Sequence, residues 1–380
     1  MRGGHLPLSQ ATRSREVIVL GLGPHITLRA PVLFRPMSAL ERYGHCRAMW
    51  HLSSRAFAIA LLGVGSVALS SAIAVPRTVD PLPSWSDGIA KDRIIAFVDR
   101  VTTPGNVDYV PPDDRIATFD NDGTLWVEKP FPVEVYFMLN RLNQLAKEDS
   151  SLRLQQPFKA ALAGDAGYFH TSGVERAVMD LVVKTETEMT QERYMADARQ
   201  FLSSAFNPSR REQFVQLAYQ PMLELLVYLR ANGFQTWLCS GGSTDFMRAY
   251  APKVYGISTM QTIATEIDRD YRDVHGMRVI WRLPHAEPLN DRARKAVNID
   301  RAIGRRPLFA AGNVASGGDV DMLEYSRGRP GLSFQLLVHH DDAEREFAYE
   351  ELDSVSLRAA ARNGYTVVSM KHDWRTIFPR

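Results

Sequence analysis

Apolar residues follow two different periods along the chain, and the change of period separates strands from helices. The apolar, β-branched run from Arg115 to Asp120 follows a Pro-Pro-Asp-Asp turn and predicts a strand. From Phe131 to Pro208 the apolar residues recur at helical spacing, so we expect helices there and no strand. Met222 belongs to another such helix, which ends at Asn232-Gly233 and leads into a buried strand from Phe234 to Cys239.

Helices and strands continue to alternate in the rest of the chain. This alternation predicts an α/β fold, with a mainly parallel sheet covered by helices on both faces. In such sheets the ligand site lies at the carboxyl ends of the strands. We expect helices at Ile89–Val101, Lys295–Ile303 and Asp342–Leu357, strands at Leu308–Ala311, Ser333–Val338 and Thr366–Ser369, and a hairpin ending at Arg278–Trp281.

The composition is that of an ordinary globular protein. Of 380 residues, 45% are hydrophobic and 23% are charged, which allows a sizeable core and either one domain with an insertion or two small domains. The formal net charge is only +2 with the histidines neutral. Because nucleic-acid binding usually requires a concentrated basic surface, we expect no nucleic-acid partner.

A segment near the N-terminus has the features of a signal peptide. The residues from Ala56 to Ala74 are apolar, follow Arg47 and Arg55, and end in the small-x-small pattern Ala72-Ile73-Ala74. They predict a signal peptide over residues 49–74, and hence an exported protein, periplasmic or secreted. The alternatives are a buried helix and an uncleaved anchor that would make the membrane a partner, although this Gly/Ala/Ser-rich segment has low hydrophobicity for a stable span.

The predicted signal peptide begins far into the chain. Residues 1–48 show no clean periodicity, and we expect a leader of uncertain translation there, because Met37 or Met49 is an alternative start. Of the two cysteines, Cys46 precedes the signal segment, so Cys239 alone would remain in the processed chain and no intrachain disulfide is expected. Cys239 lies in an apolar run and is expected to be a small core residue.

The first predicted strand ends in the string Asp120-Asn121-Asp122-Gly123-Thr124. Two carboxylates at a spacing of two can face the same side of a strand end. Keeping both charged requires a cation, and Mg²⁺ prefers oxygen ligands of this kind. One carboxylate can then attack phosphorus while the other acts as acid and base. The alternative is an acidic turn that merely ends the strand, since Asp-Gly is a common turn dipeptide.

Polar groups also follow the next two predicted strands. Ser240-Gly241-Gly242-Ser243 precedes a predicted helix, so its hydroxyls and amides can bind a phosphate; the alternative is a helix-capping turn. Lys295 begins the helix before the strand Leu308–Ala311, whose end leads into the loop 312–322. A cation and an acidic loop there would complete a phosphate and metal site. Singly, a lysine is usually solvated and Gly-Gly-Asp is usually a turn.

Together and in this order, these four motifs resemble the haloacid dehalogenase superfamily, and within it the bacterial phosphoserine phosphatase-like hydrolases. The resemblance spans roughly Asp113 to Met322 and extends more loosely to Asp373-Trp374. It implies a Rossmann-like, doubly wound, mostly parallel sheet with an inserted helical cap. The core would comprise residues 75–130 and 209–380. The cap would comprise residues 131–208 and would close over small substrates.

The resemblance also implies a role for each motif residue. Asp120 would be the nucleophile that forms an aspartyl-phosphate, and Asp122 the acid and base. Ser240 and Gly241 would hold the phosphate, and Lys295 would stabilise Asp120 and the transferred group.

The same resemblance implies a magnesium ion as cofactor. Asp120, the backbone carbonyl of Asp122 and an acidic residue of the loop 312–322 would bind it. Family members usually place the two polar residues of that loop three or four positions apart, whereas Asn313 and Asp319 have five residues between them. We expect Asp319 to be the ligand with Asn313 nearby, and Asp321 is the alternative.

Three other features have a structural interpretation beside the functional one. His339-His340 could border the site, but such histidines are more often packing or surface groups. Trp126 could contact substrate, and packing between cap and core is the favoured role. Asp245 and Arg248 fit an ordinary pair on a helix surface.

The function predicted from these residues is the Mg²⁺-dependent hydrolysis of a small phosphomonoester, a phosphorylated metabolite. Carbon–halogen hydrolysis on the same fold does not require an acid and base two residues after the nucleophile, so Asp122 favours phosphate. A non-catalytic phosphate-binding protein is the alternative from another class, because of the irregular spacing from Asn313 to Asp321. Cap residues would choose the substrate, and phosphoserine is suggested only by analogy.

Overall fold

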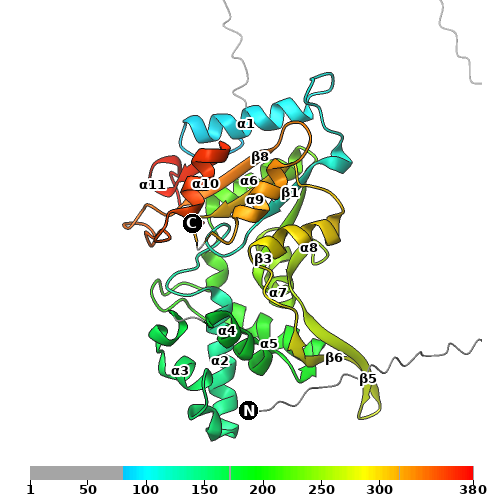
Figure 1. Cartoon of the computed structure of the whole chain (residues 1–380), viewed down its shortest axis with the longest axis vertical. Helices are drawn as coiled ribbons and strands as arrows, with labels where there is room; N and C mark the ends of the chain where they lie inside the picture. The colour runs from blue at the N-terminus through cyan, green and yellow to red at the C-terminus, as the bar shows by residue number, and fades with distance from the viewer. Residues whose placement is uncertain (1–79, 171–172, 316, 380) are drawn as a thin grey trace, which may run out of the picture. The chain divides into compact units, whose positions relative to one another are not determined.

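The five strands predicted for the main sheet, together with one that was not predicted, β4, form a single six-stranded parallel sheet in the computed structural model (Figure 1). Its order is β4-β3-β1-β7-β8-β9, so β1 lies inside the sheet between β3 and β7. All carboxyl ends of parallel strands meet at one edge of the sheet. The strands are β1 (Ile116–Phe119), β3 (Gln235–Ser243), β4 (Thr262–Thr265), β7 (Phe309–Asn313), β8 (Phe334–His339) and β9 (Thr366–Ser369).

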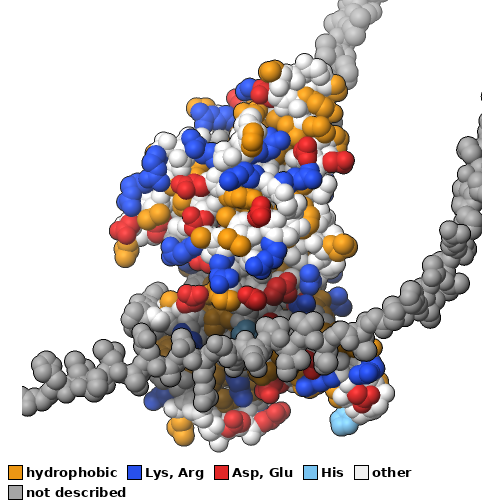
Figure 2. All heavy atoms as spheres, turned by 45° about the vertical axis from the view of Figure 1, so that its right-hand side comes forward, with side chains coloured by type: hydrophobic (Ala, Val, Ile, Leu, Met, Phe, Trp, Pro, Cys, Tyr) orange, Lys and Arg blue, Asp and Glu red, His pale blue; other side chains and the backbone are white. Residues whose placement is uncertain are grey.

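The structure describes residues 80–170, 173–315 and 317–379. The predicted leader, the signal segment 49–74 and Cys46 lie outside the described residues, so export stays a prediction. No helix in the described ranges is long and apolar enough to cross a membrane. Basic and acidic side chains are interspersed with hydrophobic ones on the face shown in Figure 2.

Helices cover both faces of the sheet because the strand side chains alternate between two cores. In β8, Leu336 and Val338 pack into one cluster and Leu337 packs into the other. The helical residues of the first cluster include those of α1 (Ile89–Thr102), α6 (Gln220–Ala231) and α7 (Thr244–Val254). Those of the second cluster come from α8 (Ala293–Ile303), α9 (Val320–Arg327) and α10 (Val355–Asn363). The predicted doubly wound α/β arrangement is therefore confirmed.

The insertion between β1 and β3 is helical, as its apolar spacing predicts. It contains α2 (Val133–Glu148), α3 (Phe158–Ala163), α4 (Val174–Glu186) and α5 (Gln191–Ser204). We call residues 131–208 the cap. The expectation of no strand there is wrong at one short position, because β2 (Met189–Thr190) pairs with β6 (Met277–Ala286) of the hairpin formed with β5 (Ile267–Val274). These three strands make a small antiparallel sheet beside the cap helices.

The helix predicted at Asp342–Leu357 is wrong. The chain forms turns there, and α10 begins only at Val355. The Asp342 side chain accepts hydrogen bonds from the backbone amides of Glu344 (3.2 Å) and Arg345 (3.1 Å), which gives the backbone an alternative to helix. Arg345 also donates to the carbonyl of Met370 (2.7 Å), a tertiary contact that no local pattern reveals.

Helix α1 offers a test of how much the core packing contributes to stability. Ile94 is fully buried against the sheet and Ile89, on the same helix, is 74% exposed. We expect Ile94→Ala to lower the free energy of unfolding by about 2–5 kcal/mol, because it leaves a cavity in a close-packed core. The matched Ile89→Ala should change it by less than about 0.5 kcal/mol. Urea denaturation of both variants checks this, and equal losses would contradict the packing described.

Candidate functional site

The predicted site residues converge at the carboxyl edge of the sheet. Asp120 follows β1, and its amide donates to the carbonyl of Ala311 in β7 (2.9 Å). On the other side β1 pairs in register with β3, which carries Ser240. The strand order thus brings together residues that lie far apart in the sequence.

Lys295 joins two of the predicted acidic residues. Its Nζ donates to Asp120 Oδ1 (2.6 Å) and to Asp319 Oδ1, and all three side chains are buried. Burial, and then the charge of Asp319, raise the pKa of Asp120 well above its usual value despite the nearby ammonium. Burial lowers the pKa of Lys295, but the two carboxylates outweigh it and the pKa is raised well above its usual value.

The loop after β7 reaches the site in spite of its irregular spacing. Asp319 Oδ2 accepts from the amide of Asn313 (2.9 Å), which turns its carboxylate back toward Lys295. A Cβ at Gly312 would lie 2.5 Å from the Cβ of Asp319, so only glycine leaves room for this return. Asp321 lies in the first turn of α9 and makes no such contact. The structure therefore brings Asp319, and not Asp321, to Asp120.

Asp122 is partly buried near Asp120 and is held by an aromatic donor. Trp126 Nε1 donates to Asp122 Oδ1 (2.8 Å), and the indole stacks on Tyr250 of α7 with ring centroids 4.3 Å apart. Burial raises the pKa of Asp122 to about 6, although the Trp126 bond opposes the shift. Trp126 is therefore a packing residue, as favoured, but it packs on the core. The hydrogen bond between Trp126 and Asp122, which lies four residues earlier in the chain, was not predicted from the sequence.

A buried histidine fixes the turn that follows Asp122. His340 Nε2 lies 2.7 Å from the carbonyl oxygen of Gly123, and the imidazole stacks on Tyr349 (centroids 4.2 Å apart). Gly123 has φ of +75°, and a Cβ there would clash with the side chain of Asn313. The packing interpretation holds for His340, while His339 is partly exposed.

The Ser-Gly-Gly segment, which was expected to be a turn after the strand, belongs to the end of β3 and is held from both sides. The buried Asn290 donates from Nδ2 to the carbonyl of Ser240 (3.0 Å), and Thr265 Oγ1 donates to the carbonyl of Gly241 (2.8 Å). The capping alternative fails at Ser243, which precedes α7 but makes no side-chain cap bond. Its hydroxyl instead donates to Glu134, which belongs to the helical insertion 131–208.

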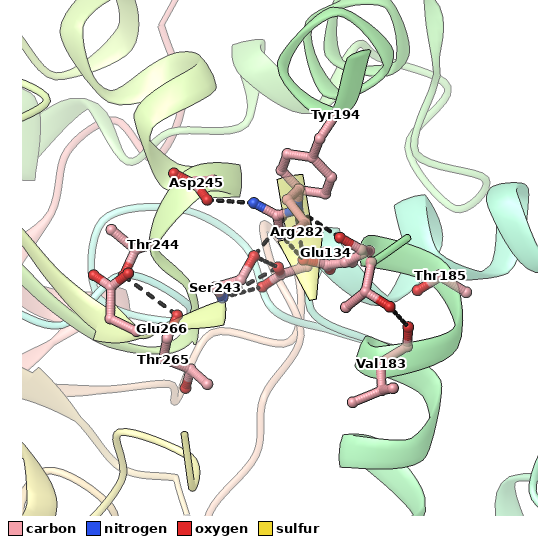
Figure 3. Close-up of polar contacts among 12 residues, drawn as sticks. Glu134, Val183, Thr185, Tyr194, Ser243, Thr244, Asp245, Thr265, Glu266 and Arg282 are labelled. Carbon is pink, nitrogen blue, oxygen red and sulfur yellow. Dashed lines mark hydrogen bonds and ion pairs between the residues drawn. The ribbon is translucent and has the colours of Figure 1, made fainter. Parts of the chain in front are cut away.

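Glu134 links the cap to this end of β3. Its Oε2 accepts from the amide of Ser243 (2.9 Å), and Figure 3 shows this contact beside Arg282 and Tyr194. Tyr194 donates to Glu186 (2.8 Å), which lies at the end of α4. A signal for Glu134 does exist in the sequence, since it stands on the apolar face of α2 one turn before Met138.

Arg282 extends this network by connecting the hairpin to α7. It is fully buried, its side chain donates to Asp245 and to the carbonyl of Glu186, and its guanidinium lies 3.7 Å from the ring centroid of Tyr194. The surface interpretation of Asp245 is wrong: its carboxylate is buried because Arg282 and Arg269 (2.9 Å) compensate its charge. Arg248 remains partly exposed and bonds Asp245 at 3.3 Å.

Cys239 is a core residue, as expected. It is fully buried in the second hydrophobic cluster. Burial raises the pKa of its thiol to about 12, so the reactive thiolate is suppressed.

The site opens into one cavity of about 560 Å³. One end is formed by the polar residues described above, and the other by cap side chains. The residues at the polar end include Asp120, Asp122, Ser240, Gly241, Lys295, Asn313 and Asp319.

The donor set at Asp120 fits a magnesium ion in chemistry and charge. No three His, Cys, Asp or Glu side chains in the described ranges surround a single metal position. Mg²⁺, however, is commonly held by one or two carboxylates together with waters and substrate phosphate. When Asp120 and Asp319 are both ionised, Lys295 compensates only one of their charges, and a divalent cation would offset the other.

Comparison with known proteins places the chain in a family. A family model described as haloacid dehalogenase-like hydrolase matches residues 117–324, which is more than half of the chain. No curated protein matches.

Solved structures match at low identity. A protein of unknown function from Bordetella pertussis is 17% identical, with 67% of this chain and 97% of that one covered and a TM-score of 0.43. A functionally unknown protein from Anaerococcus prevotii is 14% identical, with 75% and 94% covered and a TM-score of 0.48. A phosphoserine phosphohydrolase-like protein from Francisella tularensis is 13% identical, with 69% and 95% covered and a TM-score of 0.36. At these levels nothing about activity follows from them.

The Glu134 contact predicts a pH dependence of stability. Burial, and then the charge of Glu186, raise the pKa of Glu134 well above its usual value. The folded chain thus keeps a proton that the unfolded chain has lost, so this group stabilises the fold at low pH, and the contribution is lost as pH rises through the folded pKa. Glu134→Gln cannot ionise. The melting temperature of Glu134→Gln minus that of the wild type should therefore increase from about pH 5 to about pH 9.

Glu148→Gln provides the matched control, at the exposed end of the same helix. Its melting temperature should follow that of the wild type across the pH range. Parallel curves for Glu134→Gln and the wild type would show that the Glu134 proton does not contribute.

Proposed function

Because the chain belongs to the haloacid dehalogenase-like hydrolase family, we propose that it hydrolyses a phosphomonoester through an aspartyl-phosphate on Asp120. The observation that carries the proposal is the buried contact of Lys295 with Asp120 and Asp319 at the polar end of the cavity. There the ammonium can stabilise both the attacking carboxylate and the charge of the transferred group.

Asp120 and Asp122 divide the chemistry between them. In the first step an oxygen of Asp120 bonds to phosphorus, the bond from phosphorus to the alcohol oxygen breaks, and that oxygen takes the proton of Asp122. In the second step Asp122 accepts a proton from the water that attacks phosphorus, which releases phosphate and restores Asp120. A pKa of about 6 suits this exchange, because proton transfer is most effective when the pKa lies near the working pH.

The carboxyl end of β3 supplies the phosphate contacts. Ser240 and Gly241 line the same end of the cavity as Asp120, and the bonds from Asn290 and Thr265 fix their backbone. Preorganised donors of this kind lose little entropy when the substrate binds.

A magnesium ion would be held by Asp120, Asp319 and the carbonyl of Asp122, and would neutralise charge on the phosphoryl oxygens. The irregular loop spacing, which motivated the non-catalytic alternative, does not separate Asp319 from Lys295. The presence of Asp122 beside Asp120 continues to favour phosphate over carbon–halogen hydrolysis.

The first test removes the proposed nucleophile. Asp120→Asn should reduce the hydrolysis of a generic aryl phosphate by roughly a thousandfold or more, since an amide does not form the covalent intermediate. Asp113→Asn, an exposed change before β1, is the control and should retain full activity. Phosphate release is the measurement. Wild-type rates in Asp120→Asn would refute the mechanism, and phosphate binding without turnover by the wild type would favour the non-catalytic alternative.

The second test concerns the metal. Asp319→Asn should raise the Mg²⁺ concentration needed for half-maximal activity by roughly tenfold or more, because it removes one of two carboxylate ligands. Asp321→Asn, two residues along the same chain segment, should leave it unchanged. Titration of chelator-treated protein with Mg²⁺ measures both. A larger effect of Asp321→Asn would reassign the ligand.

A further inference from the structure

The two ends of the cavity differ in chemistry. Beyond Asp120 and Lys295 the wall is made of apolar side chains from the cap. In α2 these are Val135, Met138 and Leu139, and in α4 they are Val178, Leu181 and Val182. Both sets have the spacing of one helix face, so the two helices turn an apolar stripe toward the cavity.

This apolar wall is only partly covered by the protein itself. Val135, Leu139 and Val178 are half-buried, although all three pack against the cap's own hydrophobic cluster. Removing apolar surface from water is favourable, so a ligand that covers this wall gains binding free energy. The cap end is therefore suited to an apolar group.

The charged residues of the cap end do not suit an anionic leaving group. Of the cap residues that line the cavity, Glu134 and Asp165 are charged, and both are acidic. The carboxylate of Glu134 is already bonded to Ser243, and Asp165 is exposed. A substrate carboxylate would meet no cation from the cap.

The two lysines at the cavity are also engaged. Lys295 bonds the catalytic carboxylates, and Lys129 lies 4.0 Å from Glu128 and 4.5 Å from the ring centroid of Tyr349. No arginine in the described ranges lines the cavity. Phosphoserine, which carries a carboxylate and an ammonium, and a sugar phosphate, which carries several hydroxyls, would both leave polar groups unpaired against this wall.

We propose that the substrate is the phosphomonoester of an apolar alcohol or phenol, with its hydrocarbon part against α2 and α4. This rests on the proposed function and adds the substrate class. The cavity of about 560 Å³ lies within the range of roughly 300–1,000 Å³ that holds drug-sized ligands. Burial of each further methylene group should raise kcat/KM by up to about fourfold.

The test compares matched substrates on the purified wild-type chain with Mg²⁺. The series propyl, pentyl and octyl phosphate varies only apolar length, and phosphoserine and glucose 6-phosphate supply polar groups. We expect kcat/KM to rise at least tenfold from propyl to octyl phosphate and to be lowest for the two polar esters. Equal or higher values for phosphoserine or glucose 6-phosphate would overturn the proposal.

Binding separates failure of this proposal from failure of the hydrolytic function. Calorimetry on Asp120→Asn compares octyl phosphate with phosphoserine without the need for turnover. Tighter binding of octyl phosphate, without hydrolysis of any ester by the wild type, would refute the hydrolysis and support the apolar site. Tighter binding of phosphoserine would refute the apolar site.

A variant pair locates the effect. Leu139→Asp puts a charge on the cavity wall, whereas Leu154→Asp makes the same change at a position of the cap that is 80% exposed and outside the cavity. Leu139→Asp should reduce the ratio of octyl to propyl kcat/KM at least tenfold, and Leu154→Asp should leave the ratio unchanged. Val178→Thr, which keeps the side-chain shape, should lower the same ratio and serves if Leu139→Asp does not fold. An unchanged ratio in the folded wall variants would overturn the proposal.

Discussion

The contact of one lysine with two buried carboxylates is the constraint on which the site depends. Lys295 comes from α8, Asp120 from the end of β1 and Asp319 from the loop before α9. Burying such charges is costly unless they are paired, so the three elements are held at one position by the same interaction. Glycine at position 312 and the amide of Asn313 then decide which acidic residue of the loop takes part.

A second buried network determines how the cap meets the core. Glu134 of the cap binds Ser243 at the end of β3, and Arg282 of the hairpin binds Asp245 of α7. The end of β3, where we propose that phosphate binds, is therefore fixed by a residue of the cap as well as by Asn290 and Thr265 of the core. The cavity between these groups has a polar end and an apolar end, and this division underlies the proposed choice of substrate.

Much of this arrangement was predictable because it depends on local patterns. The two periods of apolar residues predicted the parallel sheet and the helical cap, and the strand ends predicted where polar residues gather. The helix expected at Asp342–Leu357 failed because the Asp342 side chain and the tertiary contacts of Arg345 compete with helix formation. The prediction that Asp245 lies on the surface failed because its partner Arg282 lies thirty-seven residues away, and no local pattern pairs them.

The sequence by itself determined the α/β class, the Asp120–Asp122 pair and its likeness to a hydrolase family, since each follows from spacing along the chain. Tertiary structure decided that Asp319 and not Asp321 meets Lys295, that Trp126 binds Asp122, and that His340 holds the turn at Gly123. It also decided the apolar wall of the cavity. The physical reason is the same in each case. Side chains that meet only after the chain has folded are chosen by three-dimensional packing and charge compensation, which periodicity does not encode.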